Sequence, residues 1–126
     1  MKQFSDLVGH TLIGVERNTG DNDTLSFRLR DGTAILYHSQ DCCESVYIED
    51  INGDLDDLVG SPILRAEESV SRPDDISDYE SQTWTFYIIA TIKGTVTIRW
   101  IGSSNGYYSE SVSFDFRKNR FGGGNP

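Results

Sequence analysis

Two short polar segments carry the side chains best suited to binding a small ligand. The segment 104–110 combines aromatic rings, an amide and hydroxyls just after a cation, which together provide stacking surface, directional hydrogen bonds and positive charge. The segment 39–44 adds carboxylates after an imidazole, and such groups can accept hydrogen bonds from a ribose or a base edge. The candidate ligand-binding residues are His38, Asp41, Cys42, Glu44, Arg99, Trp100, Asn105, Tyr107 and Tyr108.

A purely structural role also fits part of this set. Trp84 and Trp100 have the size and apolarity of core residues. Tyr107 and Tyr108 would then brace a hairpin whose turn lies at residues 105–106. Both interpretations stay open from the sequence.

Catalytic signatures are scarce. The chain has two histidines, and it has no serine or cysteine within a recognisable nucleophile motif. Glycine-rich motifs that cradle phosphates are also absent from the sequence. We therefore expect a protein that is not an enzyme and that uses no cofactor.

Two segments resemble metal sites without meeting their requirements. The run 50–56 imitates the start of a calcium loop, but Leu55 stands where the sharp-turn glycine is required and Ser61 where the bidentate glutamate belongs. The run 38–43 offers a histidine, an aspartate and two cysteines, yet zinc spacings place at least two residues between cysteines. We expect no metal site, and we interpret the two cysteines as small half-buried turn residues.

Negative charge is concentrated in one part of the chain. The 126 residues include 20 acidic and 11 basic side chains, a net charge of −9 that opposes direct binding to nucleic acid. Residues 41–80 contain thirteen acidic side chains against Arg65 and Arg72. This region is either a solvated face or a surface for a basic partner. The acidic partner surface would consist of Glu49, Asp50, Asp54, Asp56 and Asp57.

The elements that must position these segments occur twice along the chain. The run 6–16 returns fifty-one positions later as 57–67, and the run 44–48 returns as 110–114. A repeat of this length indicates two copies of one unit that complete a common core. We expect a mainly β fold, α+β with short helical turns, in which two tandem helical-turn-plus-four-strand repeats form one pseudo-twofold domain. The repeats span residues 3–50 and 54–116.

Alternation of apolar and polar residues predicts the core strands. Each unit opens with a helical turn, at 4–8 and at 55–59, closed by Gly9 or Gly60 in the left-handed position that ends many helices. Hairpin turns are predicted at 31–32 and 93–94. The expected core positions are Leu25, Phe27, Leu29, Ala34, Leu36, His38, Val46, Ile48, Trp84, Phe86, Ile88, Ala90, Val96, Ile98, Trp100, Val112, Phe114 and Phe116.

We expect a single domain, 1–116. Two segments fall outside its strand pattern, a loop within the domain and a tail after it. The polar, proline-containing stretch 69–82 predicts a long mobile loop. The glycine-rich stretch 117–126 predicts a disordered tail.

No apolar run reaches the length of a membrane span, and the first residues lack a hydrophobic signal region, so we expect a cytosolic protein. Adjacent cysteines also exclude a disulfide framework.

A set of short runs between residues 33 and 114 is distinctive. The runs are 41–51 (DCCESVYIEDI), 60–64 (GSPIL), 83–87 (TWTFY), 90–94 (ATIKG) and 102–110 (GSSNGYYSE). Together they resemble a family of small proteins of unassigned function found widely in tailed-phage genomes. The resemblance implies a phage or prophage origin and a location in the cytoplasm of an infected bacterium. It implies no active site, and it points to counter-defence by association only.

Three hypotheses follow for function. In the first, the protein sequesters a small nucleotide-derived host immune signal between the two paired loops. In the second, it is an acidic, protein-directed inhibitor that imitates nucleic acid and binds a host defence complex such as a CRISPR effector. In the third, it degrades the signal with a metal, a role that two histidines support poorly. We prefer the first because it alone uses both loops of the repeat, which would build a shared cleft in a pseudo-dimer or a homodimer.

Overall fold

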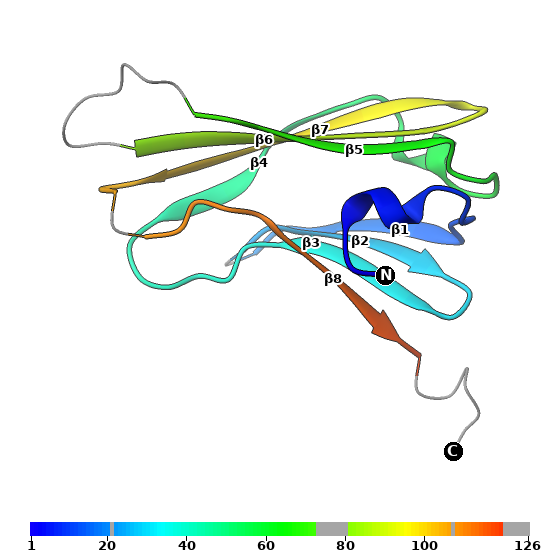
Figure 1. Cartoon of the computed structure of the whole chain (residues 1–126), viewed down its shortest axis with the longest axis horizontal. Coiled ribbons are helices and arrows are strands. Elements are labelled where there is room, and N and C mark those ends of the chain that lie inside the picture. The colour runs from blue at the N-terminus through cyan, green and yellow to red at the C-terminus, as the bar shows by residue number, and fades with distance from the viewer. Residues whose placement is uncertain (21, 73–80, 107, 120–126) are drawn as a thin grey trace.

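The chain folds into two antiparallel four-stranded sheets stacked as two layers (Figure 1). The computed structural model describes residues 1–20, 22–72, 81–106 and 108–119. Sheet 1 has the order β1 (Gly14–Asn18), β2 (Thr24–Leu29), β3 (Gly32–Tyr37), β8 (Ser113–Lys118). Sheet 2 has the order β4 (Ser45–Asn52), β7 (Gly94–Ser104), β6 (Ser81–Thr91), β5 (Arg65–Ser71). The predicted mainly β class is therefore confirmed.

Two strands cross between the layers. The strands β1 to β3 pair in chain order, but β4 leaves them and pairs with β7 in the other sheet. The strands β5 to β7 likewise pair in chain order, and β8 returns to pair with β3. Because β3 pairs with the start of β8 and β4 pairs with the end of β7, both crossing segments lie at one end of the sandwich (Figure 1).

Two 3-10 helices stand where the helical turns are predicted. They are η1 (Phe4–Leu7) and η2 (Leu55–Leu58), and each is followed by a glycine with positive φ, 92° at Gly9 and 90° at Gly60. Phe4 inserts between the two sheets, with its ring centroid 6.1 Å from that of Phe27 and 4.8 Å from that of Tyr87. The first helix therefore fills the centre of the core.

The inner faces of most strands are those that the alternation predicts. The side chains of Leu25, Phe27 and Leu36 from sheet 1 are fully buried. Those of Ile98 and Trp100 from sheet 2 are also fully buried. Burial of these branched and aromatic side chains is the main source of stability, at roughly 1.5–3 kcal/mol for each one buried.

The predicted face of β6 is wrong. Thr83, Thr85 and Tyr87 point into the core, whereas Trp84 and Phe86, together with Ile88, are only partly buried on the outer face of sheet 2. The inward residues satisfy their polar ends, because the Tyr87 hydroxyl donates to Glu68 at 2.6 Å and the Thr83 hydroxyl donates to Glu110 at 2.7 Å. The alternation in β6 places the larger apolar side chains on the outer face, so a rule that buries the more apolar face selects the wrong side of this strand.

Both hairpin turns lie one residue earlier than predicted. Leu29 pairs with Gly32, and Thr91 pairs with Gly94, so the turns are 30–31 and 92–93. Gly32 and Gly94 are the first residues of the strands that follow, and a side chain would not fit at either position. A Cβ on Gly32 would lie 2.5 Å from the Arg117 carbonyl oxygen, and one on Gly94 would lie 2.8 Å from an Asp57 carboxylate oxygen.

The strands next to the predicted loop and tail extend into the residues that were assigned to them. The strand β5 continues to Ser71 and β6 begins at Ser81, and residues 73–80 lie outside the described residues. The strand β8 includes Arg117 and Lys118, and residues 120–126 of the predicted tail also lie outside them. Among the described residues, no helix is long and apolar enough to cross a bilayer.

Candidate functional site

His38 joins the two crossing segments at the end of the sandwich. Its ring is buried, with Nε2 2.8 Å from the Glu44 carboxylate and Nδ1 2.7 Å from the carbonyl oxygen of Ser111. Both ring nitrogens are therefore engaged, one by a side chain of the β3–β4 segment and the other by the backbone of the β7–β8 segment. His38 therefore connects the β3–β4 segment to the β7–β8 segment.

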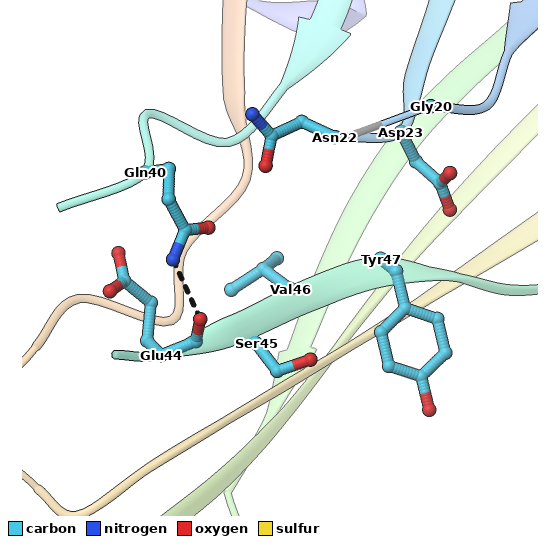
Figure 2. A pocket seen from close by; sticks show the side chains of 8 residues that line it. All are labelled: Gly20, Asn22, Asp23, Gln40, Glu44, Ser45, Val46 and Tyr47. Carbon is cyan, nitrogen blue, oxygen red and sulfur yellow. Dashed lines mark hydrogen bonds between the residues drawn. The ribbon is translucent and has the colours of Figure 1, made fainter. Parts of the chain in front are cut away.

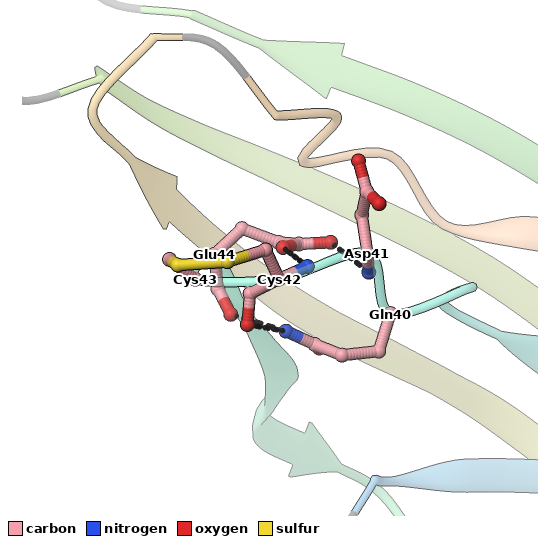
Figure 3. The surroundings of a disulfide bond; sticks show 5 residues. All are labelled: Gln40, Asp41, Cys42, Cys43 and Glu44. Atoms are coloured by element: carbon pink, nitrogen blue, oxygen red, sulfur yellow. Dashed lines mark hydrogen bonds between the residues drawn. A yellow bond between two sulfur atoms is a disulfide. The ribbon is translucent and has the colours of Figure 1, made fainter.

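Glu44 organises the β3–β4 segment around its side chain. The carboxylate accepts hydrogen bonds from the backbone N–H groups of Asp41 at 2.8 Å and Cys42 at 2.9 Å (Figure 3). The side-chain amide of Gln40 donates to the Glu44 carbonyl oxygen at 2.7 Å. The Cys42 N–H, followed by His38 and the Asp41 N–H, lowers the pKa of Glu44 from 4.5 to about 2. The carboxylate is therefore engaged by its own loop.

The two cysteines form a disulfide bond with each other at the tip of this loop (Figure 3). Cys42 and Cys43 are exposed, so the expectation of half-buried cysteines is wrong. The bond links neighbours in the chain, and it therefore connects no distant parts of the fold. Among the described residues, no group of three His, Cys, Asp or Glu side chains is arranged to hold a metal ion.

The β7–β8 segment is held by a second buried carboxylate. Glu110 accepts hydrogen bonds from the hydroxyls of Thr83 and Ser104. Ser104 also accepts a hydrogen bond from the N–H of Gly106 at 3.0 Å. Thus each crossing segment is held by a buried glutamate, Glu44 directly before β4 and Glu110 three residues before β8. Sequence reasoning did not select Glu110, although the repeat aligns it with Glu44.

The predicted site residues do not all meet. His38, Asp41, Cys42 and Glu44 are brought together. In the β7–β8 segment, Asn105 is exposed and Tyr108 is partly buried, and the predicted Tyr107 lies outside the described residues.

Arg99 and Trp100 are successive residues of β7 and point to opposite faces of sheet 2. The Arg99 guanidinium contacts Glu49 at 2.6 Å on the outer face. The Trp100 ring is fully buried in the core, where its indole Nε1 has no hydrogen-bond partner among the described residues. Trp100 thus has the structural role considered above, and Arg99 faces away from it.

A polar pocket of about 440 Å³ lies beside the β3–β4 segment (Figure 2). Its walls come from the β1–β2 connection, from Gln40 and from the first residues of β4. The lining residues are Gly20, Asn22, Asp23, Gln40, Glu44, Ser45, Val46 and Tyr47. Among the described residues of the predicted site, only Glu44 borders it. The pocket joins two loops about twenty residues apart, a proximity that only the packing of the sheets creates.

Arg17 and Asp23 fix the pocket wall to sheet 2. The Asp23 carboxylate accepts a hydrogen bond from the N–H of Ile48 at 2.8 Å, and Arg17 donates to the Ile48 carbonyl oxygen at 3.3 Å. The two side chains are 3.9 Å apart. They satisfy the backbone of β4 at its free edge, and they place a cation next to the pocket.

The residues proposed as an acidic partner surface lie toward the other end of β4 and on η2. Glu49 pairs with Arg99, and Asp54 caps η2 by accepting a hydrogen bond from the N–H of Asp56 at 3.0 Å. Asp50, Asp54 and Asp56 are exposed. A second pocket of about 430 Å³ lies near Gly9 and Arg30, away from the crossing segments.

Sequence comparison relates the chain to one protein family. The family's sequence profile matches residues 5–114, which include both crossing segments and the pocket. The chain belongs to the DUF7448 family, a domain of unknown function. No enzymatic activity is attached to the DUF7448 description. No curated protein and no solved structure matches the chain.

Proposed function

We propose that the DUF7448 chain is a duplicated unit whose halves exchange their last strands. Each half supplies a 3-10 helix and three paired strands, and it donates its fourth strand to the other sheet. Backbone contacts between the halves support a twofold relation. The Gly9 N–H donates to Ile63, and the Gly60 N–H donates to Leu12, which are equivalent bonds under the fifty-one-residue repeat. Such reciprocity is characteristic of a twofold interface.

We further propose that the protein binds and sequesters a small nucleotide-derived ligand without altering it. The observation that carries this proposal is the polar pocket beside the crossing segments. Its amide and carboxylate groups come from two loops and its hydroxyls from the start of β4, and polar groups placed in this way can fix the orientation of a polar ligand. The half-exposed ring of Tyr47 borders the pocket and offers a surface for stacking.

The lining charges indicate which part of such a ligand enters the pocket. Asp23 and Glu44 would repel a phosphate, but Asp23 can accept hydrogen bonds from ribose hydroxyls or a base amino group. Arg17 is the cation beside the pocket, and it offers a position for phosphate at the rim. These charges favour a nucleoside part inside the pocket and a phosphate at its rim.

Native mass spectrometry tests the sequestering function. The protein would be purified gently from bacteria that express candidate defence systems, and its intact mass would be compared with that of two variants. We expect a nucleotide-sized adduct that is lost in Tyr47→Ala and Asn22→Ala. Ile13→Ala, which changes the second pocket, serves as the matched control and should retain the adduct. Absence of any adduct, or equal loss in the control, would count against the pocket.

An acidic, protein-directed inhibitor is the second candidate. The exposed carboxylates of Asp50, Asp54 and Asp56 gather at the end of β4 and on η2, and they favour a basic partner. Replacing Asp54, Asp56 and Asp57 with asparagine should weaken inhibition in this case, whereas Tyr47→Ala should not. A co-purifying host protein without an adduct would support this candidate over ligand sequestration.

The cellular setting is part of the same proposal. The resemblance to tailed-phage proteins supports an origin in a phage or prophage and action in the cytoplasm of the infected bacterium. Under this proposal the protein acts against host defence by lowering the free concentration of an immune signal. It needs no membrane and no direct contact with nucleic acid, in keeping with its net charge of −9.

A further inference from the structure

The outer face of sheet 2 carries a continuous strip of large apolar side chains. Trp84 of β6 lies directly opposite Ile101 of β7, which in turn lies opposite Tyr47 of β4. Phe86 and Ile88 extend the strip along β6. These residues point away from the core, and all of them retain exposed surface. We call this strip, residues 47, 84, 86, 88 and 101, the outer apolar strip.

The distribution of residues in β6 is the reverse of what a sandwich with one solvated face requires. Its inward positions include Thr83 and Thr85, while its outward positions hold Trp84 and Phe86. An antiparallel sheet with one wet face normally alternates apolar inward with polar outward. Large apolar groups on both faces are typical of a strand that is covered on both sides. The outer apolar strip is thus an interaction surface.

Charged side chains of both signs lie beside the strip, and they form ion pairs within the chain. Arg99 contacts Glu49 at 2.6 Å, and Arg65 contacts Glu67 at 2.7 Å, with both pairs on the outer face of sheet 2. Charge of both signs therefore flanks the strip in a chain whose net charge is −9. A strongly basic partner would gain little electrostatic attraction at a face that carries both cations and carboxylates. A second copy, turned by a twofold rotation, can place each cation against a carboxylate of the other copy.

We propose that the outer face of sheet 2 binds a second copy of this chain, with Trp84 and Phe86 at the centre of a twofold interface. Aromatic side chains at the centre and ion pairs at the rim are the arrangement found in specific interfaces. This dimer is distinct from the pseudo-twofold relation within one chain. It also does not depend on the pocket, although Tyr47 borders both.

Sedimentation velocity over a range of protein concentrations tests the dimer. We expect the full chain to form dimers at micromolar concentration, and we expect Trp84→Glu or Phe86→Glu to raise the dissociation constant at least tenfold. Ile92→Glu is the matched control, because Ile92 is 81% exposed at the β6–β7 turn, away from the strip. A wild-type chain that stays monomeric, or a control that dissociates as fully as Trp84→Glu, would overturn the proposal.

Tryptophan fluorescence gives a second test that requires no charged substitution. The two tryptophans lie on opposite faces of sheet 2, Trp84 outside and Trp100 in the core. We expect acrylamide quenching to increase on dilution, as dissociation exposes Trp84. In Trp84→Phe the remaining signal comes from Trp100, and its quenching should not depend on concentration. Quenching of the wild-type protein that is independent of concentration would contradict a reversible dimer at this face.

Discussion

Single residues set the acid sensitivity of the crossing end. The pKa of Glu44 is about 2 in the folded protein, below its ordinary value of 4.5, because backbone N–H groups and His38 stabilise the ionised form. This stabilisation is complete above pH 4.5 and is lost as the pH falls toward 2. We therefore expect the melting temperature to fall across that window, as measured by circular dichroism.

The Glu44→Gln variant isolates this contribution. We expect it to be less stable than the wild type at neutral pH and to show a flatter melting-temperature profile between pH 4.5 and 2. Glu67→Gln is the control, because Glu67 pairs with Arg65 on the exposed surface, where such pairs contribute little. Equal pH profiles for the wild type and Glu44→Gln would contradict the structural role of the carboxylate.

Reduction of the Cys42–Cys43 bond should leave the fold intact. A disulfide stabilises mainly by closing a loop in the unfolded chain, and the loop between adjacent residues is the shortest possible. Glu44 continues to hold the Asp41 and Cys42 N–H groups after reduction. We expect a change in unfolding free energy of about 1 kcal/mol or less. Thermal unfolding with and without dithiothreitol, with intact mass to confirm reduction, measures it, and unfolding on reduction would refute it.

Part of the site could be predicted from single residues, and the rest depends on packing. His38 and Glu44 lie six residues apart in the chain, and sequence reasoning placed them in one group that the structure brings together. Arg99 and Trp100 were placed in the same group, but successive strand residues face opposite sides. Asn22 and Asp23 were missed, because only the stacking of the two sheets brings them to Tyr47.

At the scale of strands, β7 must pass close to the segment that leads into β8. A Cβ on Gly102 would lie 2.7 Å from the Glu110 carbonyl oxygen and 2.8 Å from its Cβ. Gly102→Ala should therefore displace this segment and destabilise the protein by about 1–3 kcal/mol. Gly20→Ala is the control, since no atom of the described residues beyond its chain neighbours lies within 4 Å of the added Cβ, and it should change stability little. Urea unfolding compares the two, and equal stabilities would contradict the close packing.

It was easier to predict which residues form strands than to predict which face of a strand is buried. The apolar alternation around Leu25 and Leu36 predicts a hairpin, and the structure confirms it with the turn moved by one residue. For β6, the alternation favours burial of Trp84 and Phe86, because the positions between them include Thr83 and Thr85. The structure resolves the choice through Tyr87, whose ring packs against Phe4 and whose hydroxyl reaches Glu68. Burial raises the pKa of Tyr87, and the hydrogen bond to Glu68 raises it further.

At the scale of the whole molecule, the two halves complete each other's sheets. β4 belongs to the first half but pairs with β7, and β8 belongs to the second half but pairs with β3. A separated half would keep three paired strands and would lose the partner of its fourth. It would also lose core contacts between the halves, such as that of Phe4 with Tyr87.

We therefore expect neither fragment 1–53 nor fragment 54–126 to fold alone, and we expect the two to form a folded complex when mixed or co-expressed. The reason is that the exchanged strands leave each fragment with an uncovered sheet face and an unpaired edge, while the mixture restores both. Dispersed amide signals in the NMR spectrum of the mixture, but of neither fragment, would be the expected result. The reciprocal bonds from Gly9 to Ile63 and from Gly60 to Leu12 re-form only in the complex. A fragment that folds alone would show that one unit buries a sufficient core without exchange, and the proposed duplication would then describe two independent domains.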